Sequence, residues 1–232
     1  KKSKSDKKKK STEKDSLKVY PNKTIHFRQN NVHDFAWFAD PNWIVQKGEL
    51  WLDDSSKQIA LWSMYLPKNA WMWRKSLDYM HDSGLWYSRF YGDYPYNHIS
   101  AVDGDMSAGG GMEYPNITVI SSSPSEDLLE YVIMHEVGHN WFYGILGTNE
   151  RDHAWMDEGL TEYSGIRYWE KKYFKRNAQL VFSDVLQNKI GIGKNYNMPH
   201  FQYSNYASNA LKDGAQPLNI SSNKNYSYRN YG

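Results

Sequence analysis

The 232-residue chain contains no cysteine. It therefore carries no disulfide framework, no thiolate metal site and no cysteine nucleophile, so a cysteine protease is excluded. Long apolar runs are missing as well, and none approaches the roughly 20 residues that a membrane-spanning helix needs. The missing cysteines leave the compartment open, and for the parent protein we favour the cell envelope or the exterior.

The chain has no large excess of positive charge once its first residues are set aside. The net charge is +2, but residues 1–18 hold nine Lys against three acidic residues, a balance of +6 that leaves −4 for the remainder. This distribution predicts no nucleic-acid partner. Residues 1–20 are interpreted as a basic, disordered linker, with a surface-binding role as the alternative. Because the chain starts at Lys1 and ends at Gly232, we interpret it as an excised piece of a longer protein.

The stretch from His135 to His139, with the letters HEVGH, carries the clearest chemistry. Its two His are four positions apart, so on a helix they share one face and can bind one metal ion. Glu136 then points to the side on which a metal-bound water would lie, where it can act as a general base. The alternative is a chance His pair on an amphipathic helix, lying at the surface or in the core.

Glu158 completes a three-ligand set. It lies nineteen positions after His139, which leaves room for one helix to end, a turn at Gly147 and a second helix. Catalytic zinc is held by three protein ligands and keeps its fourth position for water. The sequence therefore predicts one zinc ion per chain, bound by His135, His139 and Glu158.

Periodicity predicts alternating strands and helices along the chain. The expected strands cover residues 23–29, 34–39, 43–46, 49–53, 58–66, 96–102 and 112–121. The expected helices cover residues 70–91, 156–174 and 178–187, and the metal-binding helix, which begins with Ser123 as N-cap and runs through Phe142. Gly104–Gly111 is expected to be a loop, and most of residues 195–232 as well.

The motifs resemble those of the gluzincin aminopeptidases, the family of aminopeptidase N and leukotriene hydrolase. Two stretches match, His135–Trp141 and Trp155–Gly159. A third, Gly110–Tyr114 (GGMEY), resembles the family's Gly-x-Met-Glu-Asn. Tyr114 stands where the family has Asn, and Glu113 stays in register.

The resemblance implies an α+β fold, a thermolysin-like zincin domain in which a mixed β-sheet lobe packs on a helical lobe. Residues 21–45 would be the last strands of a preceding β domain, and residues 46–232 a catalytic domain truncated at its C-terminal end. The family's transition-state tyrosine lies beyond the third metal ligand, in a Tyr-x-Lys-Gly context. Three tyrosines lie in that region without this context, so the residue stays unassigned: Tyr226, Tyr228 and Tyr231.

The resemblance also implies an aminopeptidase acting on peptides with a free N-terminus. Glu113 would bind the substrate ammonium, while Gly111 and Met112 pair with its extended backbone. The alternative for Glu113 is an exposed carboxylate beside a glycine turn. Two other functions stay open, a thermolysin-like zinc endopeptidase and a non-catalytic peptide-binding relative. Two interpretations stay open for Glu162, which lies one turn after Glu158. It could contact a metal-bound His, or it could be an ordinary solvated carboxylate on a helix.

Overall fold

The computed structural model describes residues 22, 24–53, 56–106, 109–121, 123, 125–173, 198–212 and 214–225. The chain divides into two units, Lys1–Asn31 and Val32–Gly232. Residues 24–43 form no helix or strand, so the strands expected at 23–29 and 34–39 are wrong. A β-rich composition makes a strand only where a neighbouring strand accepts its hydrogen bonds, and these residues have no ladder partner among the described ones. The basic linker at residues 1–20 lies outside the described residues.

A five-stranded mixed sheet forms the first layer of the larger unit, in the order β1-β2-β3-β5-β4. Its middle pairs, β2 with β3 and β3 with β5, are parallel, and both outer pairs are antiparallel. The bounds are β1 Ile44–Trp51, β2 Gln58–Tyr65, β3 His98–Asp103, β4 Gly111–Met112 and β5 Ile117–Ile120. The two strands expected at 43–46 and 49–53 are thus one continuous strand, β1.

The single strand expected at 112–121 is also wrong, because the structure has two. β4 turns back on β5 through a turn at Pro115–Asn116, where Asn116 has a positive φ of 67°. Asn tolerates this left-handed conformation better than most residues. The turn leaves Glu113 just beyond the end of β4.

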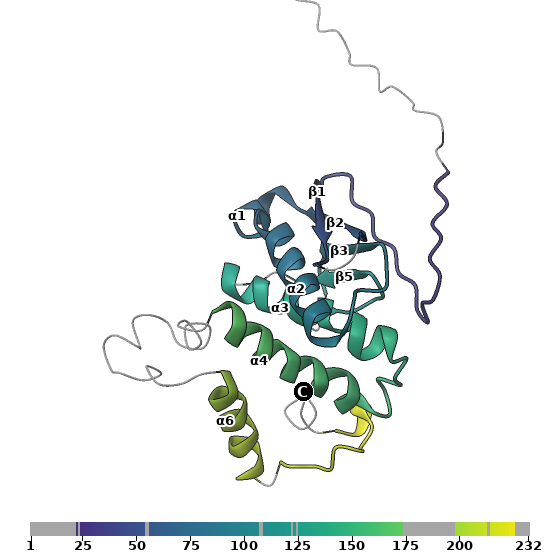
Figure 1. The fold of residues 1–232 in the computed structure, drawn as a ribbon. Coiled ribbons are helices and arrows are strands. Elements are labelled where there is room, and N and C mark those ends of the chain that lie inside the picture. Colours follow the sequence, from purple (N-terminus) through teal and green to yellow (C-terminus); the bar gives the residue numbers. More distant parts are fainter. Residues whose placement is uncertain are drawn as a thin grey trace, which may run out of the picture. The chain divides into compact units, whose positions relative to one another are not determined.

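Two helices cover the sheet. α2 (Ser76–Tyr91) packs on β1, β2 and β3, and α3 (Glu126–Gly138) packs on β4 and β5 (Figure 1). The helix expected at 70–91 is broken at Arg74–Lys75, so that Ala70–Trp73 forms a separate short helix, α1. Gly84 lies where α2 comes closest to the sheet, since a Cβ there would be 2.7 Å from Leu50. Buried apolar residues fill this layer, including Ile59, Leu61, Met80, Ile99, Leu129 and Ile133.

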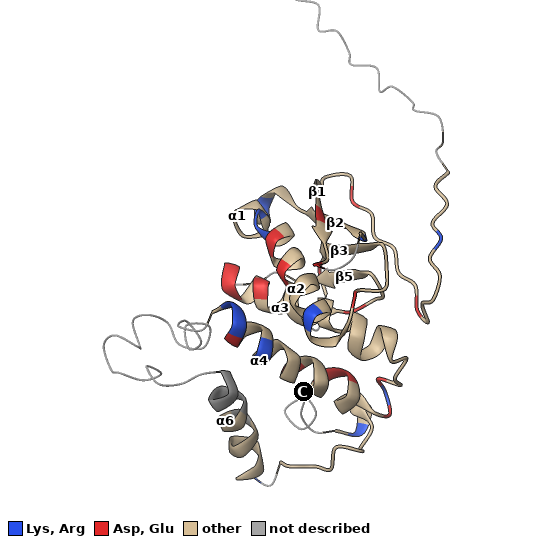
Figure 2. Cartoon of the chain, in the orientation of Figure 1, with Lys and Arg blue, Asp and Glu red and all other residues tan. Residues whose placement is uncertain are grey.

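The metal-binding helix begins two residues later than expected. Its N-cap is Ser125, whose hydroxyl accepts a hydrogen bond from the backbone N–H of Leu128 at 3.2 Å. Both Ser123 and Ser125 suit a cap by residue type, and the observed hydrogen bond decides between them. Figure 2 shows acidic residues at the first turn of α3 and basic residues at the last turn of α4 (Leu160–Lys172). Both placements are favourable for the helix dipole.

Beyond Gly138 the helix continues as a π-helical segment, Asn140–Ile145, with non-helical dihedral angles at Phe142 and Tyr143. Gly147 follows with φ of +60°, in agreement with the expected stop. The next helix is likewise composite, because Trp155–Gly159 is π-helical and leads directly into α4. π-helical turns inside helices are frequent at functional sites. Here one begins directly after His139, and the other contains Glu158.

α6 (Met198–Ala210) is a helix in a stretch expected to be mostly loop. Its Asn and Ser residues have low helix propensity, but α6 packs against α4, and tertiary packing overrides propensity here.

The helix expected at 178–187 lies outside the described residues. Among the helices that the structure describes, none combines the length and apolarity needed to cross a bilayer. The observed sheet and covering helices confirm the α+β prediction.

Candidate metal centre

Three predicted side chains from two helical segments converge on one point. His135 lies in α3 and His139 directly after it, while Glu158 comes from the π-helical turn before α4. The Nε2 atoms of the two His are 3.1 Å apart. Glu158 Oε2 lies 3.1 Å from His135 Nε2 and 3.6 Å from His139 Nε2. The sequence prediction that these three residues meet is therefore matched by their positions.

The donor atoms have the spacing of a metal site. Three ligands about 2.1 Å from one tetrahedral ion lie roughly 3.4 Å from one another. The observed distances of 3.1, 3.1 and 3.6 Å scatter around this value. Two imidazole nitrogens and one carboxylate oxygen are also the donor types that catalytic zinc uses. The residues present thus fit a zinc ion.

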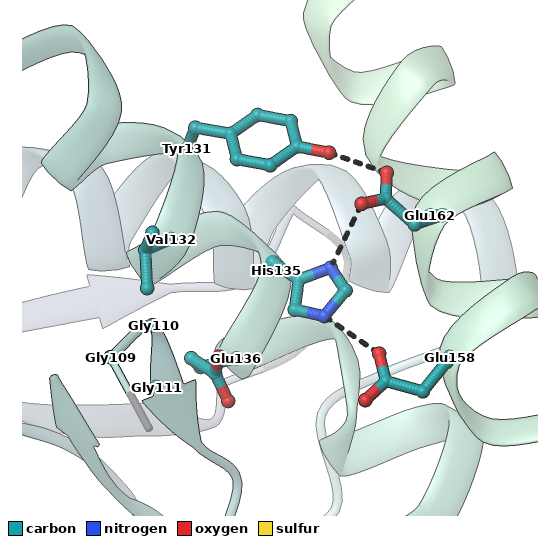
Figure 3. A pocket seen from close by; sticks show the side chains of 9 residues that line it. All are labelled: Gly109, Gly110, Gly111, Tyr131, Val132, His135, Glu136, Glu158 and Glu162. Carbon is teal, nitrogen blue, oxygen red and sulfur yellow. Dashed lines mark hydrogen bonds and ion pairs between the residues drawn. The ribbon is translucent and has the colours of Figure 1, made fainter. Parts of the chain in front are cut away.

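A second layer of side chains orients both His rings. His139 Nδ1 lies 2.5 Å from Asp157 Oδ1 and 3.2 Å from the Thr161 hydroxyl. His135 Nδ1 lies 3.9 Å from Glu162 Oε1, and Glu162 Oε2 in turn accepts a hydrogen bond from Tyr131 (Figure 3). A carboxylate beside Nδ1 favours the proton on that nitrogen and leaves the Nε2 lone pair for a metal.

Glu162 is therefore no solvated helix carboxylate. Its side chain is 12% exposed and faces both Tyr131 and His135. Asp157 and Thr161 were not identified from the sequence. Asp157 could have been identified from the sequence, because an acidic residue next to a candidate metal ligand is well placed to contact another ligand. Thr161 gave none, because one Thr on a helix is unremarkable.

Glu136 lies beside the three ligands without belonging to them. It is 5% exposed, and its Oε2 atom has no hydrogen-bond partner in the described part of the chain. Burial, opposed by His135 and His139 and reinforced by Glu113, raises the pKa of Glu136 to about 8. A buried carboxylate with a free oxygen beside three candidate metal donors is placed to accept a proton from a bound water.

The raised pKa predicts a pH-dependent stability of the metal-free protein. Because the folded state favours protonated Glu136, this stabilisation is complete below the ordinary pKa of 4.5 and is lost as the pH rises through about 8. We expect the metal-free protein to lose about 2 kcal/mol between pH 6 and pH 8 from this group, or about 5 °C in Tm. His139, whose pKa is also raised although burial alone would lower it, acts in the same direction.

Thermal unfolding of the metal-free wild type and of Glu136→Gln, at both pH values, measures this effect. The variant should show a clearly smaller fall in Tm, because Gln does not titrate. A wild-type Tm that stays level or rises across this interval would contradict the raised pKa.

The predicted substrate-binding residues lie next to Glu136. Gly111 and Met112 form the edge strand β4, and a Cβ on Gly111 would lie 2.3 Å from Glu136 Oε1. Glu113 is 8% exposed, which rules out the expected alternative of an exposed carboxylate. It offers an oxygen within 4.8 Å of donor atoms on Glu136 and His139. Burial raises the pKa of Glu113.

A pocket of about 330 Å³ opens between β4 and the two segments that carry the candidate metal ligands. Figure 3 shows the glycine loop on one side, Glu136 and His135 at the centre, and Glu158 and Glu162 on the other. Gly109, Gly110 and Gly111 form the loop side. They present backbone without side chains to whatever enters. The arrangement combines a candidate metal site, a candidate base and the edge strand β4 in one cleft.

Comparison with known proteins gives one family and several relatives. The profile of the "Peptidase family M1 domain" matches residues 84–226. Human aminopeptidase Q is 36% identical over 64 residues, which are 26% of this chain and 6% of that protein. Leucine aminopeptidase 2-1 of Meyerozyma guilliermondii is 31% identical over 115 residues, or 47% of this chain and 18% of that protein. The chain thus spans a small part of these relatives.

Solved structures show the same fold. An M1 zinc metallopeptidase from Deinococcus radiodurans matches with a TM-score of 0.50 and 13% identity, over 77% of this chain and 35% of that one. A variant from the same organism, bound to a Tyr-Ser-Ala substrate, matches with a TM-score of 0.52 and 12% identity, over 82% and 38%. At such identities the likeness concerns the fold alone.

Proposed function

The chain belongs to peptidase family M1, and from this premise we propose that it is the metal-binding part of a zinc aminopeptidase, which removes single residues from the N-terminus of peptides. The family membership confirms the resemblance read from the sequence. One observation carries the proposal: three metal-donor side chains converge beside a buried Glu136 that has a free oxygen. This combination supports hydrolysis better than binding alone, because a binding protein has no use for a base at that place.

In this proposal His135, His139 and Glu158 hold the zinc ion. A bound zinc supplies Lewis acidity, which lowers the pKa of a coordinated water and polarises the substrate carbonyl. Asp157 and Glu162 keep the two imidazoles in the orientation that the distances show. Glu136 accepts the proton of the attacking water and later delivers it to the leaving amine.

Substrate recognition is assigned to β4 and Glu113. β4 is the last strand of the sheet and pairs only with β5 in the described residues, so its other edge is open to an extended peptide. Glu113 follows this strand directly and lies beside Glu136 and His139. It would bind the substrate ammonium one residue away from the bond that is cut. This fixed distance is what makes a peptidase remove one residue at a time.

Acetylation of the substrate tests the proposal. We expect a peptide with a free N-terminus to be cleaved far better than its N-acetyl form, because acetylation removes the positive charge. Glu113→Ala should cost about 2–4 kcal/mol in kcat/KM for the free peptide and little for the acetylated one. The four kcat/KM values of zinc-loaded wild type and variant form a double-mutant cycle on this charge pair. A coupling energy near zero, with the acetylated peptide cleaved well, would replace the aminopeptidase with a zinc endopeptidase.

A further inference from the structure

We propose that Asn140 is a positioning residue, which holds the turn after Glu113 against the end of α3 and thereby sets where the substrate ammonium lies. The proposal rests on the aminopeptidase function above and deepens it. Asn140 directly follows His139 and is 6% exposed. It belongs neither to the converging donor groups nor to the residues that line the pocket. Its effect on the reaction is therefore exerted through its neighbours.

The strand that leads to Glu113 is too short to fix this residue by itself. β4 comprises only Gly111–Met112, and it pairs with β5 over these two residues. Residues 109 and 110, which precede it, are glycines with φ of +72° and +69°, and glycine restrains a backbone least of all residues. The Thr118 hydroxyl donates to the Met112 carbonyl at 2.9 Å, which is the last contact before Glu113. The position of Glu113 thus depends on the turn that follows it.

That turn contains a buried backbone donor that the turn itself does not use. The backbone N–H of Ile117 donates to the Tyr114 carbonyl at 3.0 Å. Pro115 and Asn116 lie between them, and Pro followed by a residue of positive φ, here 67°, is typical of a type II turn. Asn116 is 2% exposed, so its own N–H needs a partner inside the protein. Asn140 Oδ1 is that partner, at 3.1 Å.

The carboxamide of Asn140 can lie only one way round. Its Nδ2 donates to the Val137 carbonyl, at the end of α3, at 3.1 Å. A backbone N–H can only donate and a backbone carbonyl can only accept, so the amide oxygen faces Asn116 and the amide nitrogen faces Val137. The buried Tyr94 hydroxyl also lies on the side of the oxygen, 3.4 Å from Oδ1. One planar group therefore joins α3 to the turn.

The two segments joined in this way carry the groups whose separation selects the bond that is cut. Glu113 lies three residues before Asn116, and His139 lies one residue before Asn140. Glu113 and His139 offer atoms within 4.8 Å of each other. A displacement of about 1 Å at a reacting site can cost about 100-fold in rate. The hydrogen bond between Asn116 and Asn140 therefore sets the distance between the ammonium site and the candidate metal site.

Amide hydrogen exchange on the metal-free protein tests the contact without any activity. Asn140→Ala removes both hydrogen bonds of the side chain. We expect the Asn116 N–H to exchange at least about 10-fold faster in this variant, while the N–H groups of β2 and β3 keep their protection. An unchanged exchange rate at Asn116 would overturn the proposal.

Kinetics on the zinc-loaded protein test the consequence. The substrates are one tripeptide with a free N-terminus and its N-acetyl form. In Asn140→Ala we expect the ratio of the two kcat/KM values to fall about 10- to 100-fold, mainly through a higher KM of the free tripeptide. The variant should still bind one zinc ion, because all three donor side chains are present.

Two further variants separate positioning from stability. Ser63→Ala removes another buried hydrogen bond, the 2.6 Å contact between Ser63 Oγ and Ser76 Oγ that joins β2 to α2. It should lower Tm but leave the exchange at Asn116 and the ratio of kcat/KM values within about twofold of the wild type. Asn140→Asp keeps an oxygen for the Asn116 N–H and loses only the donor to Val137. It should keep the ratio within about fivefold of the wild type.

The outcomes distinguish the two proposals. If the wild type cleaves both tripeptides equally well, or neither, the aminopeptidase function fails and the positioning role fails with it. If the wild type prefers the free amine and Asn140→Ala prefers it as strongly, the positioning role is overturned and the function stands. Loss of zinc from Asn140→Ala, or an equal fall of the ratio in Ser63→Ala, would overturn it too. Should Asn140→Ala fail to fold, Asn140→Asp decides, since loss of its preference would refute the oxygen contact and retention would support it.

Discussion

Replacing Glu136 with Gln is expected to lower kcat by about 10²- to 10⁴-fold while leaving the zinc content unchanged. Gln has the shape of Glu but accepts no proton at neutral pH, so the attacking water loses its base. Glu136 stands outside the three converging donor atoms of His135, His139 and Glu158, and metal binding should therefore survive. The measurement is kcat on a free-amine chromogenic substrate together with the zinc content of the same sample.

The unchanged zinc content is the control that gives this result its meaning. A loss of both activity and zinc would show only that the site had collapsed. Undiminished turnover in zinc-loaded Glu136→Gln would remove the general-base role from this residue.

Replacing His139 with Ala is expected to abolish stoichiometric zinc binding. His139 is 1% exposed and supplies one of three donor atoms, and its loss would also leave the buried Asp157 without its imidazole partner. Changes among the outer partners of a metal site already cost about 10- to 100-fold in affinity, so loss of a donor itself should cost more. Metal analysis after dialysis and competition with a chromophoric chelator measure the change.

His153→Ala is the matched control for this experiment. His153 is exposed, lies in the sequence between His139 and Glu158, and belongs to none of the converging groups. Its replacement should leave one zinc ion per chain. Retention of one zinc ion in His139→Ala, with the same affinity, would refute the ligand set.

The local part of the site was predictable from the sequence. Two His four positions apart on a helix share a face whatever the rest of the fold does, because the helical repeat sets their geometry. Glu136 follows from the same repeat. Glu158 could be nominated because its distance along the chain allows a return to the ion, and GGMEY placed Glu113 by resemblance. In the structure His135, His139 and Glu158 converge, with Glu136 and Glu113 beside them.

Where a prediction depended on which segments pair, the sequence was a weaker guide. The β-rich run at 34–39 forms no strand because it lacks a ladder partner among the described residues, and the polar run 198–210 forms α6 because it packs on α4. Propensity describes one segment at a time, whereas strand pairing and helix packing need a second one.

The side chains that contact the candidate metal ligands also depend on how separate segments pack. The sequence by itself indicated the family and nominated the candidate metal donors and the candidate base, because these reside in short motifs with a fixed local geometry. Only the tertiary structure decided that Asp157 and Thr161 contact His139, that Glu162 faces His135, and that Asn140 contacts Asn116. These contacts join side chains from separate elements, and their distances are set by how helices and loops pack rather than by their spacing along the chain.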